Sequence, residues 1–144
     1  MQRHRRLAGP AVLAICLLVT TGCVHAASVD AEQMYGLASA LTKLSAVVES
    51  AVGFKDPPPG LTDAGLVAFA TQHDPTLRVP FEGYTLRTLR RDPHAAVLVC
   101  TPDGTRALLE DAGCSAALDK HRWKDDPPTP CEFTLDLAAV CLPR

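Results

Sequence analysis

Four residues in the C-terminal half of the chain have the types that bind zinc: Cys114, Asp119, His121 and Cys131. Their spacing contains neither C-x-x-C nor H-x-x-x-H, the pairs that place ligands around a tetrahedral zinc ion. A thiol–disulfide enzyme also needs a C-x-x-C thiolate at a helix start, and the chain has no such pair. The sequence therefore predicts no metal site and no cofactor.

Hydrolysis would need a nucleophile, a base and an orienting carboxylate, and Ser115, His121 and Asp119 supply these types close together. The G-x-S-x-G turn that exposes a nucleophilic serine is missing. Glu110 and Asp111 could be paired acids for glycoside cleavage, but adjacent strand residues point to opposite faces. We predict that the protein is not an enzyme, with a small hydrolase using His121 as an alternative.

Trp123, the single tryptophan of the chain, follows His121 and Arg122 directly. These three residues form a candidate partner-binding loop, because tryptophan and arginine are enriched in binding hot spots. The alternative, which we favour for Trp123, is that its ring closes the core beneath the loop. A partner would be another envelope protein or a host protein.

Residues 1–26 have the composition of an export signal, since Arg3, Arg5 and Arg6 precede an apolar block over residues 11–19. The block is much shorter than the roughly 20 residues that span a bilayer. Val24-His25-Ala26 has the small-x-small pattern of a cleavage site, which would leave residues 27–144 as one exported domain.

A second processing route is encoded at residues 19–23, Val-Thr-Thr-Gly-Cys. This stretch resembles the lipobox of bacterial lipoproteins, although Thr20 stands where leucine is usual. The resemblance implies a signal over residues 1–22, lipidation of Cys23 and, because Val24 follows it, an outer-membrane destination facing the periplasm. We favour this route. The alternative is a periplasmic or secreted protein with Cys23 in the discarded leader.

Loss of the leader removes three of the fourteen basic residues and none of the sixteen acidic ones, which leaves a formal charge of −5. A nucleic-acid-binding surface needs a basic face, so this class is excluded. A membrane would be reached only through a lipid on Cys23.

Four cysteines remain in the mature chain, an even number that predicts two disulfides in an oxidising compartment. Cys100 and Cys114 lie too far apart across the predicted hairpin to be bridged, and Cys131 and Cys141 lie at opposite ends of a predicted strand. We therefore predict the nested pairs Cys100–Cys141 and Cys114–Cys131, the second of which would hold the loop from Asp119 to Pro130.

Two helices are predicted from the spacing of apolar residues and from the residues that begin and end helices. Asp30 and Gln33 have capping-box spacing, and apolar residues recur every three or four positions from Met34 to Ala51, which predicts a helix ending near Gly53. This stripe could face a partner helix or the protein's own sheet, and we favour the sheet. A second helix is predicted from a Thr62 cap to about Gln72.

Strands are predicted over residues 83–91, 95–100, 106–110 and 132–140. Thr101-Pro102-Asp103-Gly104 has the residues of a type I turn and should join the two central strands as a hairpin. Arg87, Arg90 and Arg91 would form a basic patch on the first strand, a pattern typical of a solvated face.

The sequence thus predicts an α+β fold, with a long amphipathic N-terminal helix and a short second helix on a three- to four-stranded antiparallel sheet, and two disulfides. The expected function is binding by a small exported envelope protein. An alternative is an enzyme inhibitor that presents the disulfide-held loop.

Overall fold

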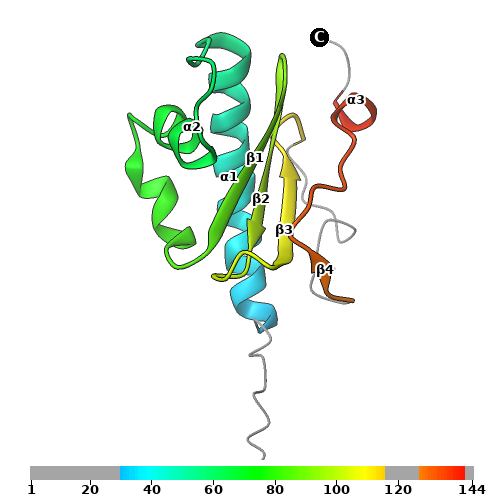
Figure 1. The fold of residues 1–144 in the computed structure, drawn as a ribbon. Coiled ribbons are helices and arrows are strands. Elements are labelled where there is room, and N and C mark those ends of the chain that lie inside the picture. Colours follow the sequence, from blue (N-terminus) through cyan, green and yellow to red (C-terminus); the bar gives the residue numbers. More distant parts are fainter. Residues whose placement is uncertain (1–29, 116–126, 142–144) are drawn as a thin grey trace, which may run out of the picture.

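A computed structural model describes residues 30–115 and 127–141 of the chain. Four strands form one antiparallel sheet in the order β1-β2-β3-β4; α1, α2 and η1 cover one face, and the C-terminal segment covers the other (Figure 1). The predicted α+β class is confirmed. The elements are α1 (Ala31–Phe54), α2 (Asp63–Ala70), η1 (Pro75–Phe81), β1 (Thr85–Arg91), β2 (His94–Cys100), β3 (Arg106–Ala112), β4 (Thr129–Pro130) and α3 (Leu137–Val140).

Helix α1 begins at its predicted cap, where the Asp30 carboxylate accepts a 2.8 Å hydrogen bond from the Gln33 backbone N–H. The Gln33 side chain donates a hydrogen bond to the Tyr84 hydroxyl, and within the described residues it makes no reciprocal capping-box bond with the Asp30 backbone N–H. The apolar stripe from Met34 to Ala51 is buried against the sheet, which confirms the intramolecular interpretation.

By length and composition α1 is apolar enough to cross a membrane, with a mean hydropathy of 1.3 in its most apolar window. Half of that window is buried inside the fold. This degree of burial is typical of a core helix.

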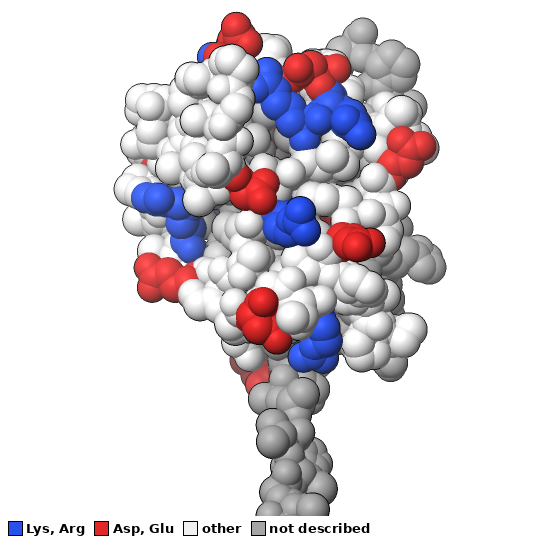
Figure 2. Space-filling view, in the orientation of Figure 1, with Lys and Arg blue, Asp and Glu red and all other residues white. Residues whose placement is uncertain are grey.

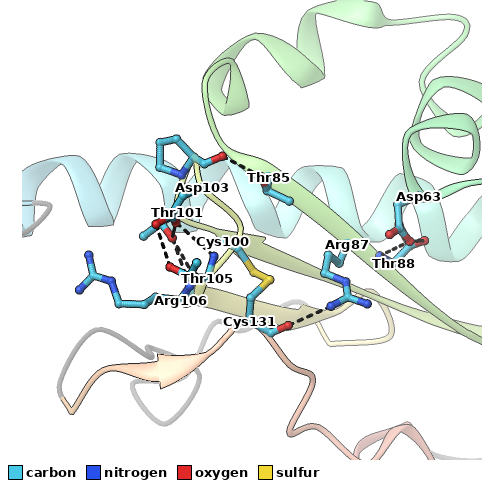
Figure 3. Close-up of a disulfide and its surroundings, with 11 residues drawn as sticks. Asp63, Thr85, Arg87, Thr88, Cys100, Thr101, Asp103, Thr105, Arg106 and Cys131 are labelled. Atoms are coloured by element: carbon cyan, nitrogen blue, oxygen red, sulfur yellow. Dashed lines mark hydrogen bonds between the residues drawn. A yellow bond between two sulfur atoms is a disulfide. The ribbon is translucent and has the colours of Figure 1, made fainter.

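Helix α2 begins after Thr62, as predicted, and its first residue Asp63 protects the free edge of the sheet. The Asp63 carboxylate accepts hydrogen bonds from the Thr88 backbone N–H at 2.9 Å and from its hydroxyl at 2.7 Å (Figure 3). Because Thr88 lies in the middle of β1, this contact satisfies an edge N–H group that could otherwise pair with another strand.

Strands β2 and β3 form the predicted hairpin, with Cys100 opposite Ala107. Along β2, Val97 and Val99 face α1, whereas Ala96 and Leu98 face the C-terminal segment. β2 is therefore covered on both sides, as its continuous apolar sequence predicts.

The predicted last strand over residues 132–140 is wrong. After the two residues of β4, which pair with Arg106 and Ala107, the chain leaves the ladder and runs along the sheet face to α3 (Figure 1). Phe133, Leu135 and Leu137 pack toward β2 and β3, so their alternation reflects burial of one side without strand pairing. We call residues 131–141 the C-terminal strap.

The predicted nested cysteine pairs, Cys100–Cys141 and Cys114–Cys131, are also wrong. The bridges are Cys100–Cys131 and Cys114–Cys141, with Cα separations of 5.7 and 5.5 Å. β4 places Cys131 beside the end of β2, and the strap then carries Cys141 to the far end of the sheet, next to Cys114. Each bridge thus fixes one end of the strap.

The backbone of α1 lies close to the end of the sheet at Gly113, directly after β3. A Cβ atom at this position would lie 2.2 Å from the Ser45 carbonyl oxygen and 2.4 Å from the Glu49 Cβ. Since both obstacles belong to a packed helix, a side chain here must push α1 off the sheet.

Gly113→Ala is therefore expected to lower the free energy of unfolding by about 1–3 kcal/mol, measured by urea denaturation. Gly36→Ala is the matched control, because Gly36 lies in α1 with open space around it. That substitution should raise stability by up to about 1 kcal/mol. Equal stability of the two variants would contradict the close approach.

Candidate functional site

The three arginines of the predicted basic patch on β1 make different contacts. Arg87 donates a 3.1 Å hydrogen bond to the Cys131 carbonyl oxygen on the strap (Figure 3), and Arg90 pairs with Asp92 at 2.7 Å. Arg91 is exposed, and its guanidinium has no partner within the described residues. Figure 2 shows Lys and Arg interspersed with Asp and Glu on this face, with the largest basic group at the end opposite the N-terminal trace. Within the described residues, Arg91 is thus the arginine of this patch whose guanidinium has no hydrogen bond and no ion pair.

Glu110 connects the sheet to the middle of the strap. Its side chain is fully buried on the strap side of β3, where it accepts hydrogen bonds from the Thr134 backbone N–H at 2.8 Å and the Thr134 hydroxyl at 2.9 Å. It also accepts one from the Leu135 backbone N–H. The carboxylate therefore satisfies two consecutive N–H groups that the strap, lacking a strand partner, cannot satisfy itself.

Asp111, the next residue, is also fully buried but points to the opposite face, where its carboxylate accepts a hydrogen bond from the Ser45 hydroxyl of α1. The two acids thus lie on opposite sides of the sheet, and this confirms the prediction that they point to opposite faces.

A third buried acid, Glu49, orients His94 at the start of β2. Glu49 Oε1 lies 2.7 Å from His94 Nδ1, and Oε2 accepts a hydrogen bond from the Ala95 backbone N–H. The Glu49 side chain is 4% exposed and that of His94 is 13% exposed. With Nδ1 held by a carboxylate, the imidazole is fixed in orientation and Nε2 is the nitrogen left for other contacts.

His94 lines a groove between the β1–β2 turn and the strap, which we call the β1–strap groove. The groove has a volume of about 340 Å³. Leu89, Leu135 and Leu137 form its apolar walls. Arg91, Asp92, His94 and Asp136 supply its polar groups.

The groove offers both apolar and polar contacts for a ligand. Its lining within the described part of the chain includes no serine, threonine, cysteine or lysine that could attack a substrate. Asp92 is paired with Arg90, and Asp136 accepts a 3.0 Å hydrogen bond from the Ala138 N–H as the cap of α3. The arrangement is suited to holding a small molecule.

Five of the residues singled out from the sequence lie outside the described part. Cys23 precedes it, and Asp119, His121, Arg122 and Trp123 fall between residues 115 and 127. The predicted lipidation and partner-binding residues are therefore placed by sequence alone. Cys114 and Cys131 belong to two different disulfides, which leaves neither thiolate for zinc. Residues 30–115 and 127–141 contain no group of three or more potential metal ligands.

Sequence reasoning missed the groove, the buried acid Glu49 and the role of Glu110 in holding the strap. One signal was available for Glu49, because it directly follows Val48 of the apolar stripe and therefore lies at the border of the buried face. Nothing in the pattern pairs it with His94, which is 45 residues away in the chain.

In comparisons with known proteins, the chain matches no family model, no curated protein and no solved structure. Its function must therefore be argued from its own residues.

The turn between β2 and β3 holds the Asp103 carboxylate in a small network of hydrogen bonds. Hydrogen bonds from the Thr101 hydroxyl and from the backbone N–H and hydroxyl of Thr105 lower the pKa of Asp103 below its usual 3.8 (Figure 3). Because the folded pKa is depressed, the ionised carboxylate stabilises the fold above pH 3.8, and this contribution is lost as the pH falls through the folded pKa.

Asp103→Asn is expected to lower the urea midpoint at about pH 6, and the difference from the wild type should shrink by about pH 2.5. Asp103 is fully exposed, so the effect is small. The exposed Glu82, whose carboxylate has no hydrogen bond within the described residues, provides the control Glu82→Gln. A difference that stays constant across this pH range would contradict the assignment.

Proposed function

We propose that the protein is an exported envelope protein that acts by binding and not by catalysis, anchored to the outer membrane through a lipid on Cys23. The observation that supports this best is the doubly bridged strap. Two disulfides fix the segment that covers one whole face of the sheet, and such bridges persist in oxidising compartments.

The buried acids support the binding role. Glu49, Glu110 and Asp111 all accept hydrogen bonds from the protein's own groups. Acids used in this way stabilise the fold, whereas a catalytic acid or base must reach a substrate. The β1–strap groove has apolar walls and oriented polar groups, which is the usual composition of a ligand site.

The experiment that tests the proposal is the intact mass of the mature protein extracted from its native membrane fraction. A diacylated or triacylated chain that starts at Cys23 is expected, with the loss of four hydrogens that two bridges require. A chain that starts at Ala27 without acyl groups would remove the lipid anchor and leave a periplasmic or secreted protein. Cys23→Ser should move the protein into the soluble fraction if the anchor is real.

An enzyme inhibitor remains a second candidate, because bridged cysteines flank the segment between them on both sides. Cys114 is tied to Cys141, and Cys131 is tied to Cys100, so the ends of residues 115–130 are fixed to the sheet. Pre-organised loops bind with less loss of conformational entropy. A protease-protection screen with Trp123→Ala as control would test this candidate. No observation in the described part favours the hydrolase using His121.

A further inference from the structure

The β1–strap groove contains an unsatisfied positive charge beside apolar walls. Asp92 is neutralised by Arg90 at 2.7 Å, and Asp136 is held by the α3 N–H group that it caps. Arg91 has no ion pair or side-chain hydrogen bond within the residues that the structure describes. Asp136 keeps its negative charge, because a backbone N–H does not neutralise a carboxylate, so the groove holds one guanidinium and one carboxylate without an ion pair within the described residues. Of these two groups, the Arg91 guanidinium is the one that can pair with an anionic ligand.

The groove also has a fixed polar group next to this cation. Glu49 holds Nδ1 of His94 from the helix side, so the ring lines the groove in one orientation. The apolar walls come from two separate segments, Leu89 on β1 and Leu135 and Leu137 on the strap. The strap wall is held in place by Glu110 and by the Cys114–Cys141 bridge.

From these contacts we infer that the β1–strap groove binds a small aliphatic monocarboxylate. The carboxylate pairs with the Arg91 guanidinium at the mouth, and the hydrocarbon chain lies against the three leucines. Arginine matches the planar carboxylate with a forked pair of donors. The volume of about 340 Å³ is at the small end of ligand sites and suits a short hydrocarbon chain such as that of octanoate. This inference rests on the proposed binding role and names the ligand class.

Octanoate is the probe, titrated into the oxidised mature protein while backbone amide shifts are followed by NMR. We expect saturable shifts at Leu89, Leu135 and Leu137, and binding at least about tenfold weaker for octanol and octylamine, which keep the chain and change the head group. Absence of saturable shifts, or equal binding of octanol, would overturn the inference.

Three variants test the assigned contacts. Arg91→Gln is expected to weaken octanoate about tenfold, whereas Arg78→Gln, an equal charge change on an exposed residue outside the groove, should leave it unchanged. Asp136→Asn keeps a good helix cap and removes a nearby negative charge, so octanoate should bind about two- to fivefold more tightly. An equal loss of octanoate affinity in both arginine variants would mean that the net charge of the protein causes the effect, and this result would refute the site.

The two proposals fail separately. Octanoate binding depends on the groove alone and is measured on purified protein, whereas export and lipidation are read from the mass of the native protein. A lipidated protein that does not bind octanoate would overturn the ligand assignment and leave the envelope role in place.

Discussion

Replacing Cys100 and Cys131 together by alanine is expected to lower the free energy of unfolding by about 3–4 kcal/mol. The bridge joins residues 31 positions apart, and its loss returns the entropy of that loop to the unfolded chain. Both residues are buried, so the alanine pair also leaves space beside Leu98 and Phe133. Urea denaturation under oxidising conditions measures the change.

The second bridge provides the matched comparison. Cys114→Ala with Cys141→Ala opens a loop of similar span, 27 positions, and should cost a similar amount. The local consequences differ, because only this pair frees the α3 end of the strap. Amide exchange should then accelerate at Leu137, next to the groove, and octanoate binding should weaken. Wild-type stability in either double variant would contradict the structural role of the bridges.

The connectivity itself is testable by peptide mapping without reduction. Cleavage at Arg and Lys and then at Glu separates the four cysteines into the peptides 92–106, 111–120, 125–132 and 133–144. The structure requires 92–106 to be joined to 125–132, and 111–120 to be joined to 133–144. A linked pair of 92–106 and 133–144 would restore the nested pattern.

The elements that the sequence predicts well are those specified by neighbouring residues. The Asp30 cap and the stripe that follows determine α1, and the Pro102–Gly104 turn determines the β2–β3 hairpin. In contrast, η1 has two prolines within seven residues, a composition that carries no helical period.

The strap shows why local pattern was insufficient at the C-terminus. The alternation of Phe133, Leu135 and Leu137 with polar residues correctly indicates which side is buried. Alternation cannot distinguish a strand that pairs at a sheet edge from an extended segment that lies across a sheet face. The two cases place Cys141 differently, and the error in the disulfide pairs follows from that one choice.

The candidate site was beyond sequence reasoning for a related reason. Its groove forms where β1 meets the strap, and its oriented histidine depends on a glutamate from α1. These contacts join three segments that are distant in the chain, so no spacing within one segment predicts them.

Glu110→Ala is expected to lower the free energy of unfolding by about 3–5 kcal/mol, the largest effect of any single substitution considered. The backbone N–H groups of Thr134 and Leu135 both donate to Glu110 Oε1 and lie where the strap covers the sheet. Removing the acceptor leaves both partly buried donors without this partner, and an unsatisfied group costs about 1–3 kcal/mol. The loss of the buried Glu110 side chain itself adds to this cost. Urea denaturation measures the loss, with the disulfides intact.

Two variants distinguish the hydrogen-bond acceptor that Glu110 provides from the negative charge that it carries. Glu132→Ala removes an exposed carboxylate from the same strap and should change stability by less than about 0.5 kcal/mol. Glu110→Gln keeps a carbonyl oxygen for both N–H groups, so most of the stability should return. If Glu110→Gln were as unstable as Glu110→Ala, the negative charge and not the acceptor would hold the strap. If Glu110→Ala were as stable as the wild type, the bridges alone would suffice, and the buried glutamate would need another explanation.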